Sequence, residues 1–131
     1  MKKFALLVVL VLGSSLVLAA CSSGPSINVT LTDFAYAPNT FTVPAGAQVA
    51  LHVRNNGAVE HEFAIMKKGT SVAPPFGDKD EGNIYWELDA IEAGTTKTAT
   101  FTAPSEPGDY EVICGLLGHI EKGMVGTLTV K

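Results

Sequence analysis

Short runs of alternating apolar and polar residues, separated by turn sequences, make up most of the chain from residue 27 onward. Apolar side chains occupy every second position in residues 27–31 and 49–53, and threonines do so in residues 96–102. Pro-Ala-Gly at 44–46 and Asn-Asn-Gly at 55–57 form turns between such runs. Because successive side chains of a strand point to opposite faces of a sheet, each run predicts a half-buried strand. About seven to eight such strands predict an all-β fold, an antiparallel β-sandwich.

Residues 70–90 do not follow this alternation. The proline pair at 74–75 excludes a regular helix there, because proline lacks a backbone N–H and clashes with the preceding turn. The acidic residues at 78–81 form either a solvated loop or a docking patch for a basic partner. Periodicity does not decide whether residues 83–89 form a helical turn or a short strand. We therefore expect an irregular loop insertion in this part of the sandwich.

The amino terminus has the features of an export signal. Lys2 and Lys3 precede a mainly apolar run at 4–18, which Leu-Ala-Ala-Cys closes at residues 18–21. This order predicts a secretory signal peptide over residues 1–20. The closing residues resemble the bacterial lipoprotein box, which implies cleavage before Cys21 and acylation of its thiol. An ordinary signal peptide that leaves Cys21 free is the alternative.

The lipoprotein interpretation defines the expected organisation of the chain. Residues 21–26 would be the lipidated cysteine and a short linker, and residues 27–131 would be one domain, expected to be monomeric. The protein would be extracytoplasmic, on the periplasmic side or at the cell surface, and lipid-anchored to a bacterial membrane. Loss of Lys2 and Lys3 with the signal changes the formal net charge from −4 to −6. With this acidic balance and no basic patch, nucleic-acid binding is excluded.

The two cysteines of the chain are Cys21 and Cys114. If Cys21 carries lipid, Cys114 is an unpaired thiol in an oxidising compartment, where cysteines normally form disulfides. Metal ligation explains such a thiol, and a Cys21–Cys114 disulfide is the alternative.

Cys114 begins a series of three metal-binding side chains at intervals of five residues. His119 and Met124 follow it, and the intervening segment contains three glycines, Gly115, Gly118 and Gly123. Neither a helix nor a strand places positions i, i+5 and i+10 on one side, whereas a glycine-rich loop can bring them together. A thiolate, an imidazole and a thioether suit copper, and the blue-copper arrangement requires a second histidine.

His61 is the candidate for that second histidine. It opens a strand and shares a face with Phe63 and Ile65, although a histidine on an apolar face is more often a core residue than a ligand. His52 lies on the outward face of its strand beside Arg54, so we expect a solvated surface histidine there.

The segments around these residues resemble the cupredoxins, the small blue copper proteins. The similarity lies in residues 60–63 (EHEF) and in residues 108–130, which contain GDYEVIC, a Gly-His pair and GMVGTLTV. The spacing matches the auracyanin and rusticyanin type. The resemblance implies a Greek-key β-sandwich that binds one type 1 copper ion. It implies that the equatorial ligands are His61, Cys114 and His119 and that the weak axial ligand is Met124.

The resemblance also implies an electron carrier rather than an enzyme, which exchanges single electrons with redox protein partners. Such partners could dock at an apolar patch around His119 formed by Leu116, Leu117 and Ile120, unless these side chains pack in the core.

Two departures from the family concern residues beside the ligands. Glu62 stands where the family often has Asn, and Leu117 stands in place of the usual Pro before Gly-His.

The same residues are also compatible with other functions. A module that buffers or delivers copper is the alternative function, although such modules prefer exposed sites rich in Met and His. A copper enzyme would need a second copper site with its own histidines. Zinc could occupy the same ligands.

Overall fold

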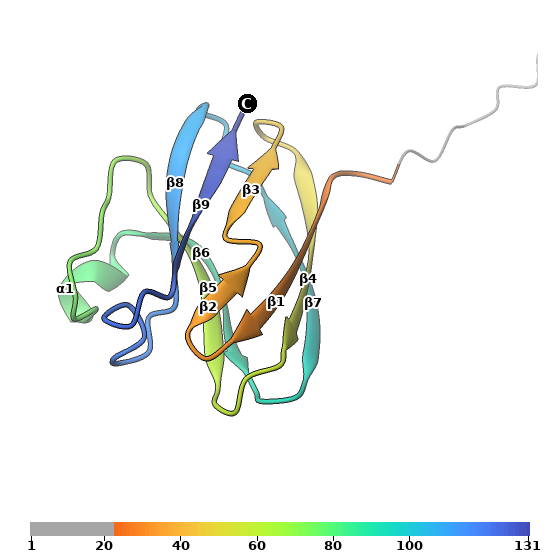
Figure 1. Cartoon of the computed structure of the whole chain (residues 1–131). Coiled ribbons are helices and arrows are strands. Elements are labelled where there is room, and N and C mark those ends of the chain that lie inside the picture. The colour runs from red at the N-terminus through yellow and green to blue at the C-terminus, as the bar shows by residue number, and fades with distance from the viewer. Residues whose placement is uncertain (1–22) are drawn as a thin grey trace, which may run out of the picture.

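The computed structural model describes residues 23–131, which form nine strands and one short helix (Figure 1). The elements are β1 (Ser26–Thr32), β2 (Ala35–Ala37), β3 (Thr40–Val43), β4 (Gln48–Asn55), β5 (His61–Met66), α1 (Asp78–Glu81), β6 (Ile84–Ile91), β7 (Thr96–Thr102), β8 (Gly108–Ile113) and β9 (Val125–Val130). The predicted signal peptide over residues 1–20 and the predicted lipidation site Cys21 lie outside the described residues. Within residues 23–131, no helix is long and apolar enough to cross a bilayer.

The strands form two sheets, with the orders β2-β1-β4-β7 and β3-β9-β8-β5-β6 (Figure 1). The predicted all-β sandwich is therefore confirmed, with nine strands, slightly more than expected. Both sheets are mixed, however, since the pairs β1–β4 and β3–β9 are parallel. The reason is that the chain crosses from one sheet to the other before and after β3, so several neighbouring strands are not consecutive in sequence.

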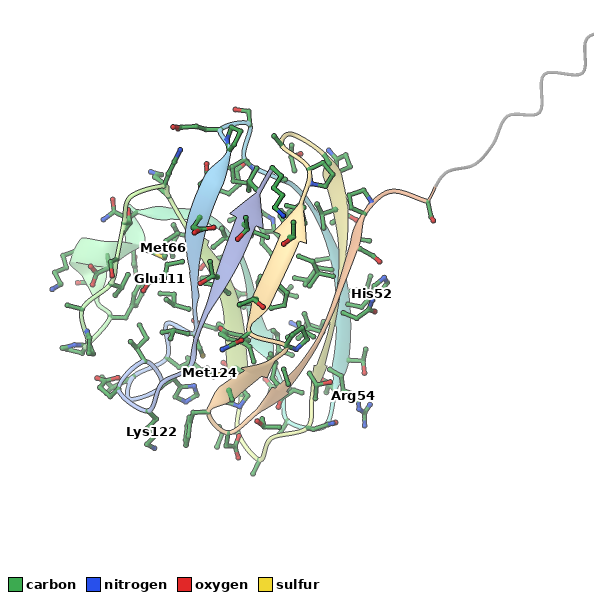
Figure 2. The ribbon with its side chains drawn as sticks, turned by 45° about the horizontal axis from the view of Figure 1, so that its top comes forward. His52, Arg54, Met66, Glu111, Lys122 and Met124 are labelled. Carbon is green, nitrogen blue, oxygen red and sulfur yellow. The ribbon has the colours of Figure 1, made fainter. Side chains whose placement is uncertain are left out.

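The predicted alternation matches the observed burial in the first sheet. In β4, Val49, Leu51 and Val53 are fully buried, whereas His52 and Arg54, on either side of Val53, are exposed and point away from the sandwich (Figure 2). The buried faces of the two sheets form one core that includes Phe63 and Leu128. Each apolar side chain removed from water in this way stabilises the folded state by about 1.5–3 kcal/mol.

Strand β5 departs from the alternation because it is covered on both faces. All its residues except Glu62 are buried, and Ala64 and Met66 belong to a second apolar cluster. That cluster also contains Val72, from the long connection between β5 and α1, whose backbone N–H donates to the Glu111 carboxylate at 2.7 Å. The irregular insertion thus packs over the outer face of the larger sheet.

Part of the region expected to be irregular is a strand. Residues 84–91 form β6, which pairs with β5 at the edge of the larger sheet, so the open choice for residues 83–89 resolves as a strand. The acidic residues at 78–81 form the single turn of α1, and none of them is buried.

Replacement of Phe63 tests the importance of the central core. Its ring is fully buried and packs edge-on against Tyr36 and Phe41, with centroids 5.6 and 5.5 Å away. Phe63→Ala should lower the free energy of unfolding of the metal-free domain by about 3–5 kcal/mol, measured by urea denaturation. Val59→Ala, at a position that is 42% exposed, should change it by less than about 0.5 kcal/mol. Equal effects of the two substitutions would contradict this account of the core.

Candidate metal centre

The predicted metal-binding residues lie at one end of the larger sheet. His61 is the first residue of β5, Cys114 directly follows β8, and Met124 directly precedes β9. Since β8 is antiparallel to both β5 and β9, the starts of β5 and β9 and the end of β8 meet at the same end. His119 lies in the loop between β8 and β9, which returns over that end. Strand pairing therefore brings together residues that are more than 50 positions apart in sequence.

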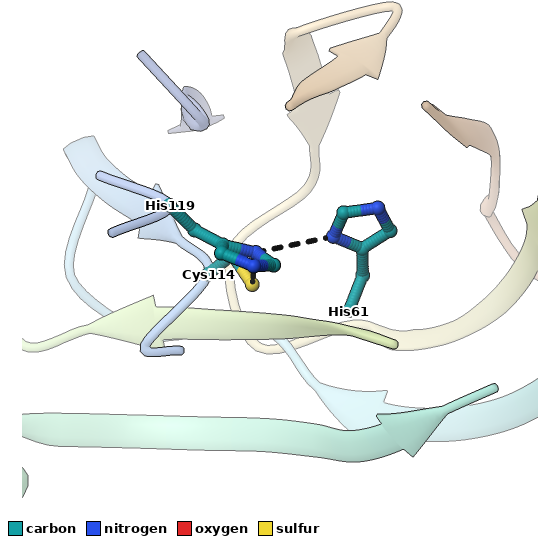
Figure 3. Close-up of side chains that lie close together, drawn as sticks. All are labelled: His61, Cys114 and His119. Carbon is teal, nitrogen blue, oxygen red and sulfur yellow. Dashed lines mark hydrogen bonds between the residues drawn. The ribbon is translucent and has the colours of Figure 1, made fainter. Parts of the chain in front are cut away.

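His61, Cys114 and His119 form a compact cluster (Figure 3). The Nδ1 atoms of the two imidazoles are 3.2 Å apart, and Cys114 Sγ lies 3.1 Å from His119 Nδ1. All the potential ligand atoms lie within 4.8 Å of one another. His61 and Cys114 are fully buried, and His119 is 8% exposed.

The separations fit a shared metal ion. Imidazole nitrogens bind such ions at about 2.0–2.1 Å, so two of them on one ion lie at most about 4 Å apart. Without an ion, two facing imidazole nitrogens and a thiol must share protons among themselves in a site closed to water. A thiolate with two neutral imidazoles is a donor set for copper or zinc.

The pKa of the Cys114 thiol is raised to about 11, mainly because burial disfavours the thiolate. Hydrogen bonds from the backbone N–H groups of Leu116 and Glu62 oppose this effect, and the Glu62 N–H lies 3.3 Å from Sγ. At neutral pH the free thiol is therefore protonated, and metal binding must displace that proton.

Burial, together with the neighbouring His61, lowers the pKa of His119 below its usual value. The ring is accordingly neutral at pH 7 and can present a lone pair to a metal ion. The two N–H groups at the sulfur and this neutral imidazole prepare the cluster for a cation.

Met124 is fully buried and closes the loop that carries Cys114 and His119. Its backbone N–H donates to the His119 carbonyl at 3.0 Å, and its carbonyl accepts from the Cys114 N–H at 3.4 Å. The tight return requires positive φ at Gly118 and Gly123, with values of 86° and 93°, which glycine adopts without strain. The loop thus places Met124 beside the cluster, and its role as axial ligand stays a prediction.

Glu62, one of the two departures from the family pattern, contacts the ligand loop. Its carboxylate accepts a hydrogen bond from the Gly115 N–H at 3.1 Å, and its carbonyl accepts one from the Tyr36 hydroxyl at 2.8 Å. Burial raises the pKa of Glu62, and the Gly115 hydrogen bond partly counters that rise. A carboxylate therefore links β5 to the loop after β8 at this position.

The predicted apolar patch around His119 is smaller than expected. Leu117 is 83% exposed, but Leu116 is half-buried against the central core. The placement of Ile120 in the patch is wrong: its side chain is buried in the second apolar cluster, because the loop turns it inward. His52 is exposed and lies 3.2 Å from the Thr98 hydroxyl, as expected for a surface histidine.

Sequence reasoning missed two residues that contact the cluster, both in the turn between β1 and β2. Asp33 Oδ1 lies 2.9 Å from His61 Nε2. The Phe34 ring packs edge-on against His119 at 4.8 Å between centroids, and the Lys122 ammonium lies 3.9 Å from the centre of the Phe34 ring. These residues follow an ordinary alternating strand, so no local pattern distinguishes them. Only the pairing of β1 within the sandwich brings their turn to the cluster.

Comparisons with known proteins agree with this arrangement. The sequence matches the family described as "Cupredoxin-like domain" over residues 3–130. The copper-resistant cuproprotein CopI of Rubrivivax gelatinosus is 26% identical over 119 residues, which cover 86% of this chain and 70% of that protein. Rusticyanin of Acidithiobacillus ferrooxidans is 31% identical over 103 residues, which cover 70% of this chain and 50% of that protein.

A solved structure provides a further comparison. Auracyanin A of Chloroflexus aurantiacus, described as a "blue" copper protein, superposes with a TM-score of 0.70 at 29% identity, covering 83% of this chain and 100% of that chain. The resemblance found in the ligand segments is thereby confirmed. Since the family match spans nearly the whole chain, this protein belongs to the family of cupredoxin-like domains.

Proposed function

We propose that this protein is a mononuclear type 1 copper protein that transfers single electrons between extracytoplasmic redox partners. The observation that carries the proposal is the buried cluster of two imidazoles and one thiol. His61, Cys114 and His119 would be the equatorial ligands, and Met124 would be the weak axial ligand. In such a site the bound ion supplies one-electron chemistry between Cu(II) and Cu(I).

The contribution of the chain itself is to hold the ligands in place. The His61 and Cys114 side chains are fixed by adjacent strands, and the Glu62 N–H points at the sulfur at 3.3 Å. Burial keeps water away from the cluster, and the hydrogen bonds of the loop at Met124 limit its movement. A site that cannot rearrange favours electron transfer over reactions that need an open coordination position.

A carrier is favoured over an enzyme by the small number of histidines. The chain has three, and His52 lies on the exposed face of β4 beside Thr98, which leaves two for one copper site.

Partners would approach the end of the sandwich where His119 lies beneath Phe34, with exposed Leu117 nearby. The lipid anchor at Cys21 is part of the same proposal. β1 runs from Ser26 toward this end, so the described chain begins at the opposite end of the sandwich (Figure 1).

Copper buffering or delivery is the second candidate function, because the relative CopI is a copper-resistant cuproprotein. The full burial of His61 and Cys114 argues against it, since handing over an ion requires access to its ligands. Two measurements separate the functions. A reversible couple with a stable potential in cyclic voltammetry supports electron transfer, whereas rapid loss of copper to an added chelator supports delivery.

Addition of one equivalent of Cu(II) to the soluble domain, residues 22–131, should produce an intense visible thiolate-to-copper absorption band. Cys114→Ser should abolish the band, because a hydroxyl is a much poorer ligand for this ion. His52→Ala is the matched control and should leave the spectrum unchanged. The absence of any band in the unmodified domain would refute the proposed function.

Met124 variants test the axial ligand. Met124→Gln should keep the thiolate band and lower the potential by at least about 59 mV, a tenfold shift in the ratio of Cu(II) to Cu(I) affinity. Met124→Leu retains the volume without a donor atom and should raise the potential. If Met124 only packs in the core, both potentials should stay unchanged, while Met124→Gln should lower the melting temperature.

Copper binding should also release about one proton near pH 8, because the pKa of the free Cys114 thiol is about 11 and the bound form is the thiolate. The lowered pKa of His119 means that this ring has already lost its proton at that pH. Copper affinity should therefore rise about tenfold per pH unit from pH 7 upward. Anaerobic calorimetry in buffers of different ionisation enthalpy measures the proton count, and Cys114→Ser should release none.

A further inference from the structure

The two nitrogens of the His61 ring have different surroundings. Nδ1 faces His119 in the cluster at 3.2 Å, whereas Nε2 points away from it and lies 2.9 Å from Asp33 Oδ1. A carboxylate can only accept a hydrogen bond here, so Nε2 must be the protonated nitrogen of the neutral ring. The Nδ1 lone pair is then directed into the cluster, where it could bind a metal ion. For His119, the described residues provide no equivalent carboxylate contact.

The Asp33 carboxylate is held in place by the loop after β4. Its second oxygen accepts a hydrogen bond from the Ala58 N–H at 2.9 Å. The loop is in turn organised by the fully buried Asn55, whose amide donates to the carbonyls of Val59 and Ile91 at 2.8 and 2.7 Å. Asn55 Oδ1 also accepts from the Gly57 N–H at 2.8 Å. The fold therefore positions the Asp33 carboxylate before any metal binds.

Gly57 shows how closely the loop approaches this contact. A Cβ atom at residue 57 would lie 2.1 Å from Asp33 Oδ1 and 2.9 Å from His61 Nε2. Any side chain there would push the carboxylate and the imidazole apart. The absence of a side chain at Gly57 is therefore a condition for the Asp33–His61 hydrogen bond.

We propose that Asp33 is a positioning residue that fixes the ring orientation and tautomer of His61 and lowers the reduction potential of the copper site. This inference rests on the proposed function. A carboxylate that accepts the outer N–H of a ligand imidazole makes that imidazole more basic, and a more basic ligand with a nearby negative charge favours Cu(II) over Cu(I). Because the contact involves one histidine only, the two imidazoles are electronically unequal.

The test compares potentials of the copper-loaded soluble domain. Asp33→Asn preserves the shape but removes the charge and leaves one acceptor oxygen in place of two, so the Cu(II)-to-Cu(I) affinity ratio should fall about tenfold, which raises the potential by about 59 mV. Glu121→Gln is the matched control. Its exposed carboxylate also acts on His119 through space, but it makes no hydrogen bond to a ligand among the described residues. Its effect on the potential should be clearly smaller.

A second measurement reports on the hydrogen bond directly. In the reduced, diamagnetic protein, nitrogen–proton NMR should show a slowly exchanging His61 Nε2–H resonance. In Asp33→Ala this resonance should disappear, or its proton should exchange at least tenfold faster. A tenfold change corresponds to about 1.4 kcal/mol of protection against exchange. If Asp33→Ala does not fold, the potential of Asp33→Asn still decides the question.

The possible outcomes separate this inference from the proposed function. An unmodified domain without a thiolate band refutes the proposed function itself. A blue unmodified domain for which Asp33→Asn and Glu121→Gln shift the potential equally overturns the role of Asp33. A lower melting temperature of Asp33→Asn, with potential and His61 resonance unchanged, also overturns it, because Asp33 would then only brace the loop at Ala58.

Discussion

The candidate metal centre depends on the antiparallel pairing of β5 with β8. The ladder aligns Ala64 with Ile113 and Ile65 with Val112, which brings the start of β5 to the end of β8. His61 and Cys114 meet for this reason, and the backbone N–H of Glu62 reaches the sulfur at 3.3 Å. A shift of one residue in this register would turn His61 away from the core, since side chains alternate between faces. The apolar cover on both sides of β5 opposes such a shift.

Burial shifts the pKa values of two groups in the cluster in opposite directions. It raises the pKa of the Cys114 thiol to about 11 and lowers the pKa of His119, so these two groups are uncharged at neutral pH without metal. A bound cation would reverse the preference of the sulfur, because a thiolate beside a metal ion no longer needs solvation by water. The hydrogen bonds to the sulfur are in place in either case. The protein therefore supplies a buried site in which the charge of the sulfur depends on the ion.

Contacts beyond the cluster come from three separate parts of the chain. Glu62 connects β5 with Gly115 in the ligand loop, and Asp33 connects the β1–β2 turn with His61. Phe34 packs against His119, and Lys122 from the loop between β8 and β9 lies over the Phe34 ring. Such outer contacts commonly change metal affinity or activity by about 10–100-fold. They give this protein means of adjusting a site whose ligand types are common to its family.

Local sequence predicted most of the strands and the set of candidate metal ligands. Alternation identified β4 and placed His52 outside and His61 inside, and spacing placed Cys114, His119 and Met124 in one loop. These features depend on neighbours within a few residues, which sequence periodicity records directly. Tertiary structure alone decided the parallel pairs, the inward turn of Ile120 and the contact of Asp33 with His61. Each of these joins segments that are distant in sequence, so its existence depends on how the two sheets pack rather than on any local pattern.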